Sequence, residues 1–143
     1  MLHILTFASS QLGQKEIVGP EHNETIVGYA QDIGLDWVSD DETPWYAIFM
    51  SWCAKQAKLS YPKSALARSW MHEGNPTANP EPGDAVIFWL ESIDSYKGHV
   101  GLFLGYSNDQ SRVYCLGGNQ GNQVSISAQP AANLLGFRRL KPR

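Results

Sequence analysis

Residues 82–106 read PGDAVIFWLESIDSYKGHVGLFLGY, and their pattern predicts consecutive antiparallel strands. The continuous apolar run at 85–90 follows a Pro-Gly-Asp turn, which is typical of a buried strand. Residues 98–106 and 112–116 stand on either side of a polar loop, and this arrangement predicts a β-hairpin. The sheet is therefore expected to occupy the second half of the chain, with two further short strands at 124–127 and 134–139.

The first half of the chain has a helical period instead. Apolar residues within 2–12 predict a first helix that ends at Gly13, and those within 23–33 predict a second that ends at Gly34. Neither segment shows the alternation of a half-buried strand. Helices are therefore expected before the sheet begins.

A third helix is predicted to begin at Pro44 with Thr43 as its N-cap, and to run to about Lys58. Helices followed by antiparallel strands predict an α+β fold. The chain has 143 residues, a length that suits one domain with one core, so we expect a single domain over 1–143.

Composition narrows the classes of function. The net charge of −3 argues against a nucleic-acid partner or binding to an anionic membrane. No apolar run approaches the ~20 residues that span a bilayer, and the N-terminus lacks the basic region of a signal peptide. The histidines and cysteines show no metal-ligand spacing, so neither a metal site nor a cofactor is expected. Cys53 and Cys115 lie in apolar runs and are expected to be buried free thiols.

The start of the third helix is where a nucleophile would work best. Helix N-termini carry unpaired N–H groups and a positive dipole end, which lower the pKa of a cysteine placed there. The residue at this position is Tyr46, whose phenol has a usual pKa near 10 and is a poor substitute. We therefore expect Tyr46 to pack over the cleft.

His99 is the candidate base. It lies between Gly98 and Gly101 at the start of a predicted strand, and these glycines leave room for another group beside the imidazole. A hairpin centred on Asp109 places His99 opposite Asn119, whose amide would orient the ring. A register slip of one residue would place Gly118 or Gln120 there instead. A core histidine bonded to backbone is the alternative.

Five segments together resemble a known family. They are Thr43-Pro44-Trp45-x-Ala47, Ala67-Arg68-Ser69-Trp70, Pro82-Gly83-Asp84, Gly98-His99-Val100-Gly101 and Leu116-Gly117-Gly118-Asn119-Gln120. In this order they are similar to the compact phage-associated and bacterial peptidoglycan hydrolases related to NlpC and CHAP amidase domains. The resemblance covers nearly the whole chain, including Gln11-Leu12-Gly13 near its start.

The resemblance implies a papain-like fold and a Cys-His-polar triad. By position, the nucleophile corresponds to Tyr46, the base to His99 and the orienting residue to Asn119, with Gln120 as the alternative third member. Cys53 does not replace the nucleophile, because seven helical residues separate it from position 46 by about 10 Å along the axis. Cys115 is expected in the hairpin, away from the helix N-terminus.

Four residues are candidates for lining a substrate cleft. They are Trp45, Arg68, Ser69 and Trp70, and aromatic rings in such a groove would stack on sugars. The alternatives are that Trp45 belongs to the core and that Trp70 packs within the fold. The implied activity is cleavage of an amide bond in peptidoglycan, as an amidase or an endopeptidase, abolished here by Tyr46. The alternative is a non-catalytic module that binds the cell wall or a partner. An immunity, holin or delivery partner is implied, because the chain would reach the wall only with help from another system.

Overall fold

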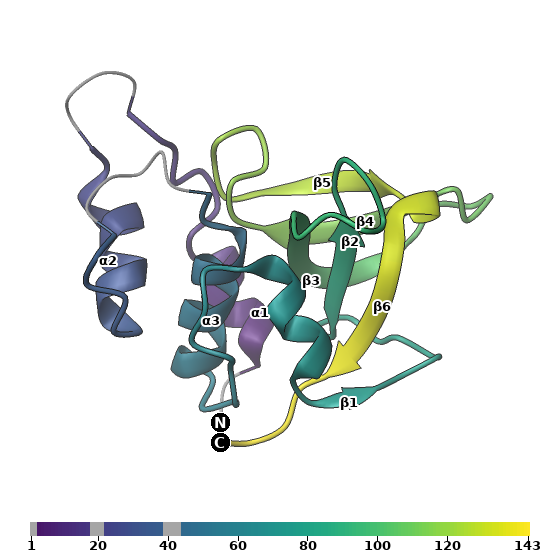
Figure 1. The fold of residues 1–143 in the computed structure, drawn as a ribbon, viewed down its shortest axis with the longest axis horizontal. Coiled ribbons are helices and arrows are strands. Elements are labelled where there is room, and N and C mark those ends of the chain that lie inside the picture. Colours follow the sequence, from purple (N-terminus) through teal and green to yellow (C-terminus); the bar gives the residue numbers. More distant parts are fainter. Residues whose placement is uncertain (1–2, 18–21, 39–43) are drawn as a thin grey trace.

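A computed structural model describes residues 3–17, 22–38 and 44–143. The fold is α+β, with helices standing beside a six-stranded antiparallel sheet (Figure 1). The helical elements are α1 (Ile4–Ser9), α2 (Glu24–Asp32), α3 (Tyr46–Gln56) and the 3-10 turns η1 (Ala67–His72) and η2 (Ala131–Asn133). Among the described residues, none of the helices is long and apolar enough to cross a membrane.

The first helix is shorter than predicted, whereas the second has nearly the predicted bounds. The first helix was predicted over 2–12, but α1 ends at Ser9. The second agrees to within a residue, because Asn23 accepts hydrogen bonds from the backbone of Thr25 and Ile26 and caps α2.

The predicted start of α3 at Pro44 is wrong by two residues. The helix begins at Tyr46, and the preceding Trp45 has φ −118° and ψ 21°, outside the helical region. Trp45 is buried and its indole donates a 2.8 Å hydrogen bond to Glu16. These contacts of the ring constrain the backbone at this position. The predicted cap, Thr43, lies outside the described residues. The helix ends at Gln56 rather than near Lys58, which has a positive φ of 59°.

The sheet contains the predicted strands and one short addition. The strands are β1 (Asn75–Pro76), β2 (Ala85–Trp89), β3 (Gly98–Tyr106), β4 (Arg112–Gly117), β5 (Ser125–Pro130) and β6 (Leu134–Arg139). Their order is β1-β6-β2-β3-β4-β5, so β2 to β5 form a meander and β6 returns to pair with β2. The predicted hairpin register is confirmed where Leu102 faces Leu116 and Phe103 faces Cys115, and a bulge after Phe103 shifts the remainder by one residue.

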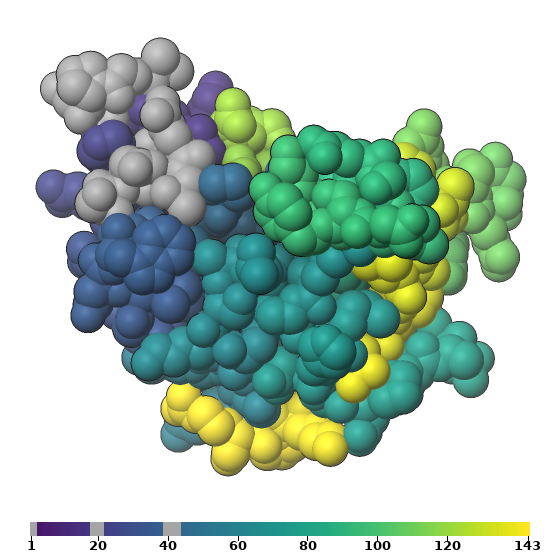
Figure 2. Space-filling model, viewed as in Figure 1, coloured from purple at the N-terminus to yellow at the C-terminus, as the bar shows by residue number. Residues whose placement is uncertain are grey.

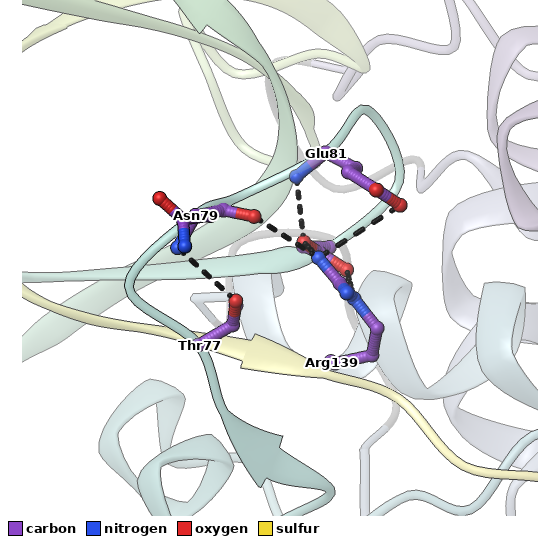
Figure 3. Close-up of polar contacts among 5 residues, drawn as sticks. Thr77, Asn79, Glu81 and Arg139 are labelled. Atoms are coloured by element: carbon purple, nitrogen blue, oxygen red, sulfur yellow. Dashed lines mark hydrogen bonds and ion pairs between the residues drawn. The ribbon is translucent and has the colours of Figure 1, made fainter.

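An ion pair fastens β6 beside the start of β2. Arg139 donates to both carboxylate oxygens of Asp84, at 3.0 Å from Nε and 2.8 Å from Nη2. Arg139 also donates to the backbone oxygen of Asn79, so it ties the loop before β2 to the same strand (Figure 3). Asp84 is 6% exposed, and a buried carboxylate in this two-pronged geometry requires its partner.

The core lies between the helices and one face of the sheet, and it positions the start of α3. Ala85 and Ile87 of β2 face the helices, together with Val100 and Leu102 of β3. The alternate residues of the strands form a smaller cluster on the other face, whose members are Val86, Phe88, Phe103, Val113, Cys115 and Phe137. Cys53 and Cys115 are buried free thiols, as predicted.

Candidate active site

Tyr46, the first residue of α3, lies against His99 at the start of β3. The two ring centroids are 4.4 Å apart and the ring planes meet at 87°, an edge-to-face arrangement. Burial raises the pKa of the Tyr46 phenol, and the nearby carboxylate of Glu16 raises it further. The phenol is therefore protonated at neutral pH and has no nucleophilic character there.

His99 is enclosed by its neighbours. Only 2% of the residue is exposed, and the ring of Phe88 stacks on it with 6.1 Å between centroids. Burial lowers the pKa of His99 from its usual 6.5 to about 4, although the hydrogen bond with Gln120 acts in the opposite direction. The imidazole is neutral at pH 7, as a general base must be before it takes a proton.

Gln120 determines which nitrogen of His99 carries the proton. Its Oε1 lies 2.6 Å from His99 Nε2, and its Nε2 donates to the carbonyl of Ser125 at 2.6 Å. The bond to Ser125 fixes the amide with its oxygen toward the imidazole, and an amide oxygen only accepts. His99 Nε2 is therefore protonated, and the lone pair of the neutral ring is on Nδ1.

The predicted pairing of His99 with Asn119 is corrected. Strand β4 ends at Gly117, two residues before the position opposite His99, and Asn119 has a left-handed φ of 56°. The chain turns there, so the following residue, Gln120, returns its longer side chain to the imidazole. The predicted register holds at Leu102 and Phe103, but the turn after β4 places Gln120, the alternative third residue, beside His99.

Glycines make room for this arrangement. A Cβ at Gly118 would lie 2.7 Å from Phe49 Cβ and 2.7 Å from Trp45 Cε3, so the loop after β4 packs directly on the start of α3. A Cβ at Gly98 would lie 3.0 Å from Arg68 Cγ, and one at Gly101 would lie 3.2 Å from Cys115 Sγ. The absence of a side chain therefore admits Arg68 beside Gly98 and Cys115 beside Gly101.

Cys115 is nearer to the site than its sequence position predicts. Its Sγ is 4.0 Å from His99 Nε2 and 3.2 Å from Gln120 Oε1. Burial raises the pKa of the Cys115 thiol to about 11, while a contact with Ser127 lowers it slightly. This protonated, fully buried thiol is a hydrogen-bond donor and not a nucleophile. Cys53 is likewise fully buried, and burial raises its pKa well above the usual value.

The N-terminal segment contacts both the loop after β4 and the residue before α3. Lys15 forms a bridge with Gln123, and the backbone N–H of Glu16 donates to Asn122 at 2.9 Å. The Glu16 carboxylate accepts the indole hydrogen bond of Trp45. The segment thus links the loop that carries Gln120 to the residue immediately before α3.

The four candidates for a substrate cleft have structural positions, and the alternatives of core for Trp45 and packing for Trp70 are confirmed. Trp45 and Trp70 are 1% and 0% exposed, so neither ring has a face for a sugar. The Ser69 hydroxyl donates to the backbone oxygen of Leu66. Arg68 donates to three backbone carbonyls of the β2–β3 loop, those of Lys97 at 2.7 Å, Ile93 at 2.7 Å and Ser92 at 2.9 Å.

A groove of about 540 Å³ nevertheless opens beside Tyr46. One wall of the groove is the β2–β3 loop, which Arg68 holds by hydrogen bonds. In Figure 2 this loop lies on the visible face, next to the segment that contains η1. Three large side chains in its lining are well exposed, namely Trp37 at 65%, Tyr96 at 71% and Leu66 at 53%. The sequence did not point to them, because single large apolar or aromatic residues in loops are common until the fold brings them together.

No protein-family model and no curated protein sequence matches the chain. The description of the site therefore rests on its geometry.

Proposed function

We propose that the chain has a papain-like fold and the framework of a cysteine peptidoglycan hydrolase, an amidase or endopeptidase, whose nucleophile position is occupied by Tyr46. The observation that carries the proposal is the neutral imidazole of His99, bonded to Gln120 Oε1 at 2.6 Å and in contact with the first residue of α3. A base oriented by an amide, beside a helix N-terminus, is the arrangement that activates a thiol for acyl transfer.

The reaction is derived for a cysteine at position 46. His99 would accept the thiol proton on Nδ1, because Nε2 already carries the proton donated to Gln120. The thiolate would attack the amide carbonyl, and N–H groups in the first turn of α3, which have no partner within the helix, would stabilise the oxyanion. The imidazolium would then protonate the leaving amine, and water would release the acyl group by the reverse sequence.

Tyr46 blocks this reaction in two ways. Its phenol stays protonated, because burial and Glu16 both raise its pKa. Its ring also occupies the space beside His99 that a substrate carbonyl would need. We therefore expect the chain as it stands to be inactive as an amide hydrolase.

A second function, binding without catalysis, is favoured by the groove. The groove stays open beside the blocked site, with Trp37 and Tyr96 exposed in its lining. Exposed aromatic rings offer stacking area at little entropic cost. In this case the chain would hold wall peptides, glycan or a protein partner. A hydrolase or a wall-binding module would act at the cell wall, after delivery by a partner system.

The decisive experiment is restoration of activity. Purified peptidoglycan of several chemotypes is incubated with the parent chain, with Tyr46→Cys and with Tyr46→Cys combined with His99→Ala, and the products are analysed by mass spectrometry. We expect new amine termini only with Tyr46→Cys, and at least about a hundred-fold less product when His99 is removed. The mass of the products separates an amidase from an endopeptidase.

Tyr46→Ser is the matched control, because it opens the same space without supplying a thiolate. Cleavage by the parent chain would show that the nucleophile lies elsewhere. A well-folded Tyr46→Cys variant that cleaves none of the walls would reject the hydrolase framework, and retention of the parent chain on insoluble peptidoglycan would then support the binding module.

A further inference from the structure

The side-chain amide of Gln120 uses its whole hydrogen-bonding capacity. Its Nε2 donates to the carbonyls of Ser125 at 2.6 Å and Cys115 at 3.3 Å. Its Oε1 accepts from His99 Nε2 at 2.6 Å and from Cys115 Sγ at 3.2 Å. A primary amide has two donor hydrogens and two acceptor lone pairs, so all four are satisfied. Gln120 is 6% exposed, and a fully satisfied buried amide has one well-defined position.

Two groups donate to Gln120 Oε1, and of these the thiol of Cys115 is the one outside the proposed triad. It is held from its far side by Ser127, the residue paired with it on β5, whose Oγ lies 3.7 Å from Sγ. Gln129 donates to that Oγ at 2.9 Å. Because Cys115 donates to Gln120, its sulfur is left to accept from the Ser127 hydroxyl. The hydrogen bonds therefore run in one direction, from Gln129 through Ser127 and Cys115 to the amide oxygen.

We propose that Cys115 is a positioning residue, whose thiol holds Gln120 Oε1 against His99 Nε2 and so maintains the tautomer with its lone pair on Nδ1. The effect on His99 is independent of position 46, and only the consequence for turnover rests on the proposed function.

Two features fit the thiol to this role. The absence of a side chain at Gly101 leaves the space into which Sγ projects, because a Cβ there would be 3.2 Å away from the sulfur. The thiol also remains protonated at neutral pH, since burial raises its pKa to about 11. A thiolate would repel the amide oxygen, whereas the thiol donates to it.

The test uses the chain with Tyr46 in place and follows His99 by nitrogen-15 NMR. The measured quantities are the tautomer of the imidazole and the rate at which its Nε2 proton exchanges with water. We expect Cys115→Ala to speed this exchange about five-fold, the factor for one net hydrogen bond. Cys115→Ser keeps a donor and should restore the parent rate. Cys53→Ala, which removes the other buried thiol, should leave the rate unchanged.

Cys115→Val is the second variant without a donor, and it keeps the strand packed if the alanine variant does not fold. Parent-like exchange in a folded donor-free variant would overturn the proposal, and so would equal acceleration by Cys53→Ala. The single variant Tyr46→Cys is then compared with the double variant that also carries Cys115→Ala, to test whether the position of Gln120 affects turnover. We expect kcat to fall about five-fold in the double variant at constant KM. Inert Tyr46→Cys with altered exchange rejects the hydrolase alone, whereas active Tyr46→Cys with unaltered exchange rejects the positioning role alone.

Discussion

The phenol ring of Tyr46 stands edge-to-face against the imidazole of His99, with 4.4 Å between the centroids and 87° between the planes. Tyr46 lines the groove, and the imidazole that its ring contacts is 2% exposed and is not part of the lining. Tyr46 therefore occupies the proposed nucleophile position and also covers one side of His99.

Removing the Tyr46 ring should raise the pKa of His99. The pKa of about 4 arises mainly from lost hydration, and Tyr46→Ala would admit water to the ring. We expect the pKa to move toward its usual 6.5, as measured by NMR titration. Tyr46→Phe is the control, because it keeps the ring and should keep the low pKa. A low pKa in Tyr46→Ala would show that other neighbours bury the imidazole.

Protonation of His99 should oppose folding in mild acid. Its pKa is about 4 in the folded chain and 6.5 in the unfolded chain, so the unfolded chain binds more protons between these values. Stability from this group is complete above pH 6.5 and declines as the pH falls toward 4, by about 3 kcal/mol in all. Urea unfolding of the parent and of His99→Phe across this range measures the difference. Parallel pH profiles for the two chains would contradict the assignment.

Gln120 and Asn119 should differ sharply in a Tyr46→Cys background. Loss of the amide that orients His99 should lower kcat at least about a hundred-fold in Gln120→Ala, because the tautomer is no longer held. Asn119→Gly is the matched control, since glycine adopts the φ of 56° without strain and removes only the side chain. Peptidoglycan turnover measures both variants. Greater loss in Asn119→Gly would return the third role to Asn119.

Arg68→Lys should loosen the wall of the groove. The guanidinium binds three backbone carbonyls between Ser92 and Lys97, and a lysine ammonium cannot reproduce this planar fork. We expect faster hydrogen exchange of the loop amides and a loss of about 1–2 kcal/mol in unfolding free energy. Arg112→Lys, at an exposed position at the start of β4, serves as the control. Unchanged exchange in the loop would show that it is held without Arg68.

The strands were predictable because burial leaves a local signature. Residues 98–106 and 134–139 alternate or run apolar between turn residues, and β3 and β6 occupy these ranges. The return of β6 to pair with β2 was not predictable, since that pairing joins residues about fifty positions apart. The contact of Arg139 with Asp84 accompanies it. Helix ends were less accurate, because a buried ring such as Trp45 changes the backbone locally.

The sequence by itself determined the order of helices and strands, the place of Tyr46 at a helix start and the place of His99 at the start of a hairpin strand. These depend on periodicity and on turn residues, which act over a few positions. Only the tertiary structure decided that Gln120 contacts His99, that Cys115 shares its amide oxygen, and that Trp45 and Trp70 are buried. Each of these outcomes depends on where a chain reversal at Asn119 and a close approach at Gly118 direct side chains. Side-chain direction after a turn is set by packing between distant segments, which no local pattern encodes.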